Sequence, residues 1–520
     1  MWSAARARRC VFMVHRWTGV AMCLVIALWV VSGVVMLFMG YPKLLPTERL
    51  GALPALPTHD CCVPVEAALR HSPAPEAVQR ITLTTIAGHP IYRLTEGDGS
   101  LQVVDAVTGL VAPRVDGAAA LRSAQAFLPG ADGVVRGMTH DDRWTHSGLL
   151  DPHRPLFQVR MRDAANTWVY VSSSTGEVVM DAPSSQRYWN FAGAWLHWVY
   201  MFRDGSRDPV WSWLVIGLSA VATLSALAGA LVGVWRWRFS GRYRSGAKTP
   251  YREFHMRWHH MTGLAFGTAM VLWLFSGVMS MNPVGLFDPV QRPDLQAYRN
   301  GTPGSTRLAL GAREALALLR SHGFDPRELE WRVLGGAPYL LASDAKAHTR
   351  IVGKDDAQHP GGLPHRVLER FPTKDLERLA RPLLPARIAA ADVLDRHDTY
   401  YVRRGAASMY AAAERDVPVL RLRFDDPGRT LVYISPSTGD VVLSADRAQR
   451  AGRWLFNLLH SWDLPWMLRQ PVFRDIVLTL LSMGAMAIAL TGIVLGLRRC
   501  VRSLRPGLHQ PAAARAGTGT

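Results

Sequence analysis

The sequence predicts a membrane protein with a bundle of four transmembrane helices and two large α+β domains outside the membrane, related by an internal tandem duplication. Three observations lead to this fold class. Four long runs lack any charged residue, two long polar segments lie between them, and several motifs recur in the second half of the 520-residue chain. A hydrophobic content of 49% with only 19% charged residues excludes both a disordered chain and an ordinary soluble enzyme.

Each uncharged run is long enough to cross a bilayer, which requires roughly 20 helical residues at about 1.5 Å each. The runs are Trp17–Tyr41, Pro209–Trp235, Met261–Phe287 and Ile476–Leu497. The first run is too long for the apolar part of a signal peptide, and no small-residue cleavage motif follows it. We therefore expect four helices that span the lipid bilayer.

Basic residues beside the spans predict the orientation of the chain. Most of the formal net charge of +18 falls in the N-terminal tail, the short loop between the second and third spans, and the C-terminal tail. Arginine and lysine near span ends are retained in the cytoplasm, so we expect both termini there and both long segments in the periplasm, in a bacterial inner membrane. Because the charge is divided among three pieces that flank the membrane, it does not indicate a nucleic-acid partner.

The repeat relates each half of the chain to the other. His15 and Gly19 recur as His259 and Gly263 at an offset of 244 residues. Other positions recur at an offset of 263 residues, and these include His197 with His460, Gly229 with Gly492, and the segment 168–179 with 431–442. The order span, outer domain, span is therefore expected twice.

These patterns divide the chain into eight predicted parts. They are a tail with the first span (1–41), periplasmic domain 1 (42–188), an interfacial segment with the second span (189–240), a cytoplasmic loop (241–260), the third span (261–287), periplasmic domain 2 (288–453), an interfacial segment with the fourth span (454–499), and a cytoplasmic tail (500–520).

Within the outer segments, the hydrophobic pattern alternates between helical and strand periodicity. Gly311–His322 and Lys374–Leu384 are expected to be amphipathic helices. The expected strands are Ser100–Asp105, Gln158–Arg162, Trp168–Ser172, Val419–Phe424 and Thr430–Ile434. A Ser-Thr-Gly turn follows the strands that end at Ser172 and Ile434, where glycine supplies a positive φ.

Together these motifs resemble the PepSY-associated transmembrane helix family, whose members include haem-bearing inner-membrane reductases of ferric siderophores. The resemblance extends from His15 to about Arg499, and it includes the His-x-x-x-Gly openings, the Ser-Thr-Gly hairpins and the Leu-His pairs before the second and fourth spans. It implies PepSY-like outer domains. The first half departs from the pattern, because His146-Ser-Gly stands where the second half has Tyr400-Tyr401.

Four histidines at repeat-equivalent positions are the candidate metal ligands. His15 and His259 lie about one turn inside the first and third spans, and an ionisable side chain in a membrane bundle usually has a function. His197 and His460 lie in aromatic segments at the outer interface. Two neutral imidazoles from facing helices suit a six-coordinate b-type haem, so two levels of paired histidines predict two haems. His255 and His260 are alternatives to His259 at the inner level, although the repeat favours His259.

Other chemistry has less support in the sequence. Zinc would require three or four clustered ligands, and no HExxH, GxSxG, P-loop or dinucleotide-binding motif occurs. Cys61 and Cys62 lie in a poorly patterned outer segment, where we expect them to be incidental or to form an intermolecular disulfide.

The resulting hypothesis is a di-haem oxidoreductase that passes electrons across the membrane to ferric siderophore iron at the periplasmic face. A quinol or a cytoplasmic flavin reductase would donate the electrons. The expected docking residues precede the paired strands: Arg143, Trp144 and His146 in the first domain, and Arg396, His397, Tyr400 and Tyr401 in the second. The alternative is a non-enzymatic PepSY-type protein that restrains a periplasmic peptidase or an envelope complex.

Overall fold

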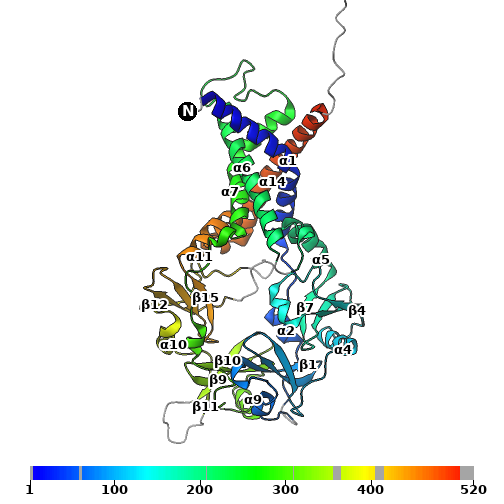
Figure 1. The fold of residues 1–520 in the computed structure, drawn as a ribbon, viewed down its shortest axis with the longest axis vertical. Helices are drawn as coiled ribbons and strands as arrows, with labels where there is room; N and C mark the ends of the chain where they lie inside the picture. The colour runs from blue at the N-terminus through cyan, green and yellow to red at the C-terminus, as the bar shows by residue number, and fades with distance from the viewer. Residues whose placement is uncertain are drawn as a thin grey trace, which may run out of the picture.

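The computed structural model describes residues 4–57, 61–205, 208–308, 310–354, 365–404 and 415–503. Four of its helices are long and apolar enough to cross a membrane: α1 (Ala4–Phe38), α6 (Pro209–Arg236), α7 (Phe254–Ser280) and α14 (Pro471–Ser503). They pack in the cyclic order α1, α6, α7, α14 and form one end of the molecule (Figure 1). We call the end of the bundle where α1 begins at Ala4 and α14 ends at Ser503 the terminal side. The sheets lie beyond the opposite end, the domain side. The predicted four-helix bundle is confirmed.

Small side chains occupy the centre of this bundle. Ala222, Ala485 and Ala489 are buried there beside Met22 and Leu274. Small residues let helices approach closely, which matters where lipid gives no hydrophobic drive for association. Large apolar side chains instead point outward from the same helices at Leu24, Val31, Leu224, Leu231, Leu480 and Leu490.

Two antiparallel four-stranded sheets lie beyond the domain side of the bundle, one at the left and one at the right of the view in Figure 1. The first contains β4 (Gly133–Thr139), β5 (Leu156–Met161), β6 (Trp168–Ser172) and β7 (Val178–Ala182), and α4 (Gly117–Phe127) packs on it. The second contains β12 (Ile388–Leu394), β13 (Val419–Phe424), β14 (Leu431–Ile434) and β15 (Val441–Ala445). Both sheets shift register at the same repeat position, between Tyr170 and Val171 and between Tyr433 and Ile434.

A seven-stranded antiparallel sheet farthest from the bundle joins the two outer segments. Its order is β11 (His365–Leu368), β10 (Thr349–Lys354), β9 (Ala337–Ser343), β8 (Glu328–Leu334), β1 (Arg80–Ile86), β2 (His89–Thr95) and β3 (Leu101–Asp105). Leu83 of β1 is paired with Leu329 of β8, and the buried rings of Tyr92 and Trp331 lie edge to face nearby. The alternating pattern of polar and apolar residues does not predict this pairing between segments 42–188 and 288–453.

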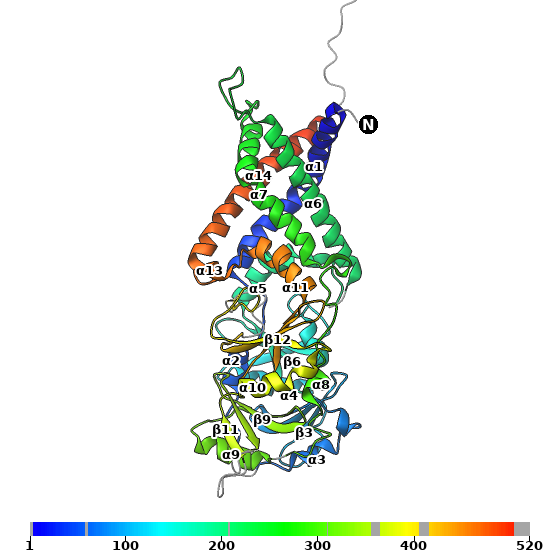
Figure 2. The ribbon, with the colours of Figure 1, turned by 90° about the vertical axis from the view of Figure 1, so that its left-hand side faces the viewer.

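The remaining helices are short. They are α2 (Pro46–Ala52), α3 (Val65–Leu69), α5 (Ser184–Asn190), α8 (Leu295–Arg299), α9 (Ala312–Ser321), α10 (Thr373–Leu379), α11 (Arg447–Gly452), α12 (Leu459–Ser461) and α13 (Pro465–Leu468). There are 3₁₀ turns η1 (Pro75–Ala77), η2 (Gly148–His153), η4 (Tyr200–Phe202), η5 (Pro283–Gly285) and η6 (Arg381–Leu383), and π-helical turns η3 (Phe191–Trp195) and η7 (Arg453–Leu458). Helices α5 and α11 lie at the junction between the bundle and the sheets (Figure 2).

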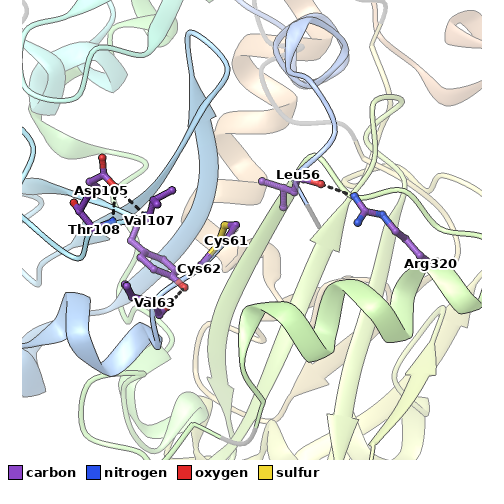
Figure 3. The surroundings of a disulfide bond; sticks show 9 residues. Leu56, Cys61, Cys62, Val63, Asp105, Val107, Thr108 and Arg320 are labelled. Atoms are coloured by element: carbon purple, nitrogen blue, oxygen red, sulfur yellow. Dashed lines mark hydrogen bonds between the residues drawn. A yellow bond between two sulfur atoms is a disulfide. The ribbon is translucent and has the colours of Figure 1, made fainter. Parts of the chain in front are cut away.

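A disulfide joins Cys61 to its neighbour Cys62 at the edge of the core of the seven-stranded sheet (Figure 3). Cys61 is buried, and the carbonyl of the next residue, Val63, accepts a hydrogen bond of 2.8 Å from the hydroxyl of Tyr92. The bond lies within one chain, so the expected intermolecular disulfide is wrong.

Candidate functional site

Two pairs of facing imidazoles lie at the two ends of the bundle. His15 of α1 and His259 of α7 form the terminal-side pair, with ring centroids 6.1 Å apart. His197 and His460 form the domain-side pair, with ring centroids 6.0 Å apart. On α1, 17 residues separate His15 from Ser32, the residue that His197 contacts, so the two levels are about 25 Å apart along the helix.

Hydrogen bonds fix the tautomer of the terminal-side pair. Nδ1 of His15 lies 3.0 Å from the backbone carbonyl oxygen of Ser225. Nδ1 of His259 lies 3.2 Å from the carbonyl oxygen of Ile488 and 3.1 Å from the hydroxyl of Thr491. A carbonyl oxygen only accepts, so each Nδ1 carries the proton in these bonds. In the neutral ring, the lone pair is then on Nε2.

Serine hydroxyls orient the domain-side pair in the same way. Nδ1 of His197 lies 3.0 Å from Oγ of Ser32, which donates its own hydrogen to the carbonyl of Leu28 at 2.6 Å. Nδ1 of His460 lies 3.0 Å from Oγ of Ser276, which donates to a carbonyl on its own helix at 3.0 Å. Each serine therefore accepts from Nδ1–H, and Nε2 keeps its lone pair. Such an Nδ1 bond is how proteins orient a histidine that binds a metal through Nε2.

The separation within each pair suits one metal ion between two imidazoles. Two metal–nitrogen bonds of about 2 Å, plus roughly 1 Å from each nitrogen to its ring centre, give about 6 Å between ring centres. No group of three or more His, Cys, Asp or Glu residues that could hold a metal occurs among the described residues. Each pair therefore offers two imidazole nitrogens.

Glycines leave space beside these rings. A Cβ at Gly229 would lie 2.6 Å from Cε1 of His15, so the imidazole occupies the place of a side chain on α6. At the equivalent Gly492, the corresponding distance to Cε1 of His259 is 3.5 Å. Gly263 and Gly267 follow His259 at four-residue intervals on one helix face, and a Cβ at either would meet nothing within 4 Å. This open stripe could accommodate a flat ligand.

The chain approaches both domain-side histidines through the same unusual backbone. The π-helical turns η3 and η7 lie immediately before the segments that carry His197 and His460. Two residues after each histidine, Val199 and Trp462 adopt left-handed φ angles of 55° and 49°. π-Turns and non-glycine residues with positive φ are costly and occur often at functional sites.

The two alternatives to His259 are held elsewhere. Both ring nitrogens of His260 are engaged, Nδ1 with the hydroxyl of Thr249 at 2.7 Å and Nε2 with the carbonyl of Gly233 at 2.9 Å. Nδ1 of His255 bonds to Glu253 at the terminal side of α7. His259 is thus the residue of α7 that faces His15.

In the first outer segment, the predicted docking residues are placed in three different environments. The guanidinium of Arg143 lies over the rings of Phe191 and Trp195, at 5.8 and 5.7 Å from their centroids. Trp144 is 9% exposed and belongs to the core of its sheet. His146 is mostly buried, and its Nδ1 donates to Asp141 at 2.9 Å. Burial opposes ionisation of Asp141, but His146 and Arg154 nevertheless hold the pKa of Asp141 below its usual value.

In the second outer segment, Tyr400 lines a cavity, and the other three predicted residues do not belong to the lining of that cavity. Tyr401 is 1% exposed and stacks on Tyr433. His397 donates from Nε2 to the carbonyl of Arg415 at 2.7 Å, and Arg396 is exposed on the surface. The structure does not bring the seven residues together.

Two aspartates that the sequence motifs do not indicate organise these loops. Asp398 accepts from the backbone N–H groups of Tyr400 and Tyr401, and from the hydroxyl of Tyr433 at 2.8 Å. Asp142 likewise accepts from the hydroxyl of Tyr170 at 2.7 Å. Tyr170 recurs as Tyr433 in the two hairpins, and a buried tyrosine hydroxyl needs a hydrogen-bond partner. This recurrence indicates that each half of the chain must supply an acceptor for its tyrosine.

The fold and these paired histidines define a four-span membrane protein with α+β domains on one side and a pair of facing histidines at each end of its bundle. The model of the PepSY-associated TM region matches residues 12–317, more than half of the chain, and the chain belongs to that family. No curated protein matches it.

Proposed function

We propose that the protein is an oxidoreductase that binds two b-type haems and passes electrons across the bacterial inner membrane to reduce ferric siderophore iron. The observation that supports it best is that all four repeat-equivalent histidines face one another in pairs with Nδ1 engaged and Nε2 available. Two such imidazoles would hold the iron of a six-coordinate b-type haem, and glycines leave space for a flat ring. When bound, haem iron supplies one-electron redox chemistry.

The residues of the chain would set the conditions for that chemistry. His15 and His259 would hold one cofactor near the terminal side, and His197 and His460 the other near the domain side. Their Nδ1 bonds would hold each ring in a fixed orientation, with the lone pair on Nε2. Trp29 adds a hydrogen bond of 2.8 Å from its indole N–H to the backbone carbonyl of His197, which anchors that ligand to α1.

Arginines on the terminal side support a cytoplasmic location for both termini and a periplasmic one for the sheets. They flank the spans at Arg6, Arg8, Arg9, Arg236, Arg238, Arg498, Arg499 and Arg502. A quinol or a cytoplasmic flavin reductase would supply electrons. Oxidation of one quinol to the quinone supplies two electrons, which reduce two ferric ions to ferrous ions, and releases two protons to the solvent. Ferrous iron binds hard oxygen ligands more weakly, so the metal can leave the siderophore.

The test is the reoxidation of the reduced, purified protein by a ferric siderophore under anaerobic conditions, followed at the Soret band. The proposal predicts rapid reoxidation of the wild type and a large loss of rate in His460→Ala. His255 provides the matched control, because its Nδ1 bonds to Glu253 and it faces neither histidine pair, so His255→Ala should reoxidise like the wild type. A reduced protein that ferric chelates never reoxidise would contradict the proposed acceptor.

A further inference from the structure

A cavity of about 350 Å³ lies on the domain side of the bundle, beside the domain-side histidines. The end of α7, the turn η7, α11 and β15 surround it, and Tyr400 and Phe456 form part of its lining. Phe456 connects the cavity to the histidines, because its ring centroid lies 5.5 Å from that of His460. One aromatic side chain thus separates the contents of the cavity from a proposed haem ligand.

The lining carries four arginines, Arg404, Arg415, Arg450 and Arg453, and none of the described lining residues is acidic. Arg404 and Arg453 both pair with Asp463, whose side chain is 1% exposed and lies just behind the lining. One buried carboxylate therefore serves two guanidinium groups.

The other two arginines contact backbone oxygens rather than carboxylates. Arg450 donates to the carbonyls of Ala445 and Arg429 at 2.9 and 2.6 Å, and Arg415 donates to the carbonyl of Tyr400 at 3.3 Å. Within the part of the chain that the structure describes, neither forms an ion pair. Burial, together with the charges of Arg404 and Arg453, lowers the pKa of Arg415. The cavity is thus a concentration of positive charge that an anion would neutralise.

We propose that this cavity binds a ferric chelate of net negative charge, with carboxylate or catecholate oxygens directed at Arg415 and Arg450. This assignment rests on the proposed function and narrows its substrate class to anionic chelates, excluding neutral and cationic hydroxamates. Guanidinium groups suit such oxygens because they donate charge-assisted hydrogen bonds in a planar fork. The volume lies within the usual range for small-ligand sites, and Tyr400 and Phe456 offer aromatic faces against the organic arms of the chelate.

Gallium(III) citrate tests the proposal without redox chemistry, because gallium(III) has the charge of ferric iron but is not reduced. Binding to the full-length protein in detergent would be measured by calorimetry. Arg415→Gln and Arg450→Gln should each raise Kd about tenfold or more, the effect of losing a hydrogen bond to a charged group. Arg447→Gln is the matched control, since Arg447 is exposed at the start of α11 and does not line the cavity.

The proposal also predicts that a neutral gallium trihydroxamate binds at least tenfold more weakly than the citrate complex, and that citrate-complex binding weakens as salt rises. Three results would overturn the proposal: the neutral complex binds as tightly as the citrate complex, Kd is unchanged in both variants, or the wild-type Kd does not depend on salt concentration. Equally tight binding of free citrate or inorganic phosphate would also overturn it, by showing a general anion site. These measurements do not depend on haem, so a protein that binds gallium citrate but cannot reduce iron would contradict the proposed function alone.

Discussion

Gly229 and Gly492 occupy equivalent positions in the two halves but differ in how closely an imidazole approaches them. A Cβ at Gly229 would lie 2.6 Å from Cε1 and 2.8 Å from Nδ1 of His15, whereas ordinary contacts begin near 3.4 Å. The ring must therefore move by at least 0.8 Å, the difference between 3.4 and 2.6 Å, to accept an alanine. That movement would disturb its 3.0 Å hydrogen bond to Ser225.

Overpacking of this kind costs about 1–3 kcal/mol, and a weakened hydrogen bond adds about 1 kcal/mol. Gly229→Ala should therefore lower haem affinity at the terminal-side pair by roughly ten- to a thousandfold, since about 1.4 kcal/mol is tenfold. Haem per chain and the reduced-minus-oxidised spectrum measure the loss. Gly492→Ala is the matched control, because its Cβ would lie 3.5 Å from His259, an ordinary contact. Full haem content in Gly229→Ala, or equal loss in Gly492→Ala, would refute the reasoning.

Three further predictions test other parts of the account. Ser32→Ala and Ser276→Ala remove the oxygen atoms that accept hydrogen bonds from the domain-side imidazoles. Each variant should weaken haem retention at the domain-side pair about tenfold and leave the spectrum of the terminal-side haem unchanged. Equal effects on the two haems would contradict this prediction. Burial raises the pKa of Asp181 to about 6, so its folded form favours the neutral acid, and stability should fall by about 2 kcal/mol as pH rises from 4 to 6. Asp181→Asn should flatten that fall in chemical denaturation, and an unchanged pH profile would show that the carboxyl is not responsible. A reporter fused after Arg244 should behave as cytoplasmic and one inserted near Gly304 as periplasmic; the reverse result at either point would reject the orientation.

The bundle could be predicted because its signal is local. Twenty or more consecutive uncharged residues have few structural options, so the four spans follow from the sequence directly. The repeat also predicted which histidines correspond. His259 faces His15, and neither His255 nor His260 occupies that position. The acceptors of Nδ1 lie on other helices, however, as Ser32 does for His197, and no periodicity indicates which helix supplies them.

The outer segments were harder because their important contacts are long-range. The pairing of β1 with β8 links residues about 250 positions apart, and alternation of polar and apolar residues identifies a strand without naming its neighbour. The environment of each predicted docking residue also depends on long-range contacts. Tyr401 stacks on Tyr433 in the core, whereas the adjacent Tyr400 lines the arginine cavity. That cavity gathers Arg415, Arg450 and Arg453 from different elements, which their sequence spacing does not reveal.

The most direct test of the central claim is the haem content of the purified protein, measured with its dithionite-reduced spectrum. The account predicts two b-type haems per chain. His15→Ala and His259→Ala should each lose one of them, and His197→Ala and His460→Ala should each lose the other, while His255→Ala keeps both. A folded wild-type protein without a reducible Soret band, or a haem that survives in all four variants, would contradict the account.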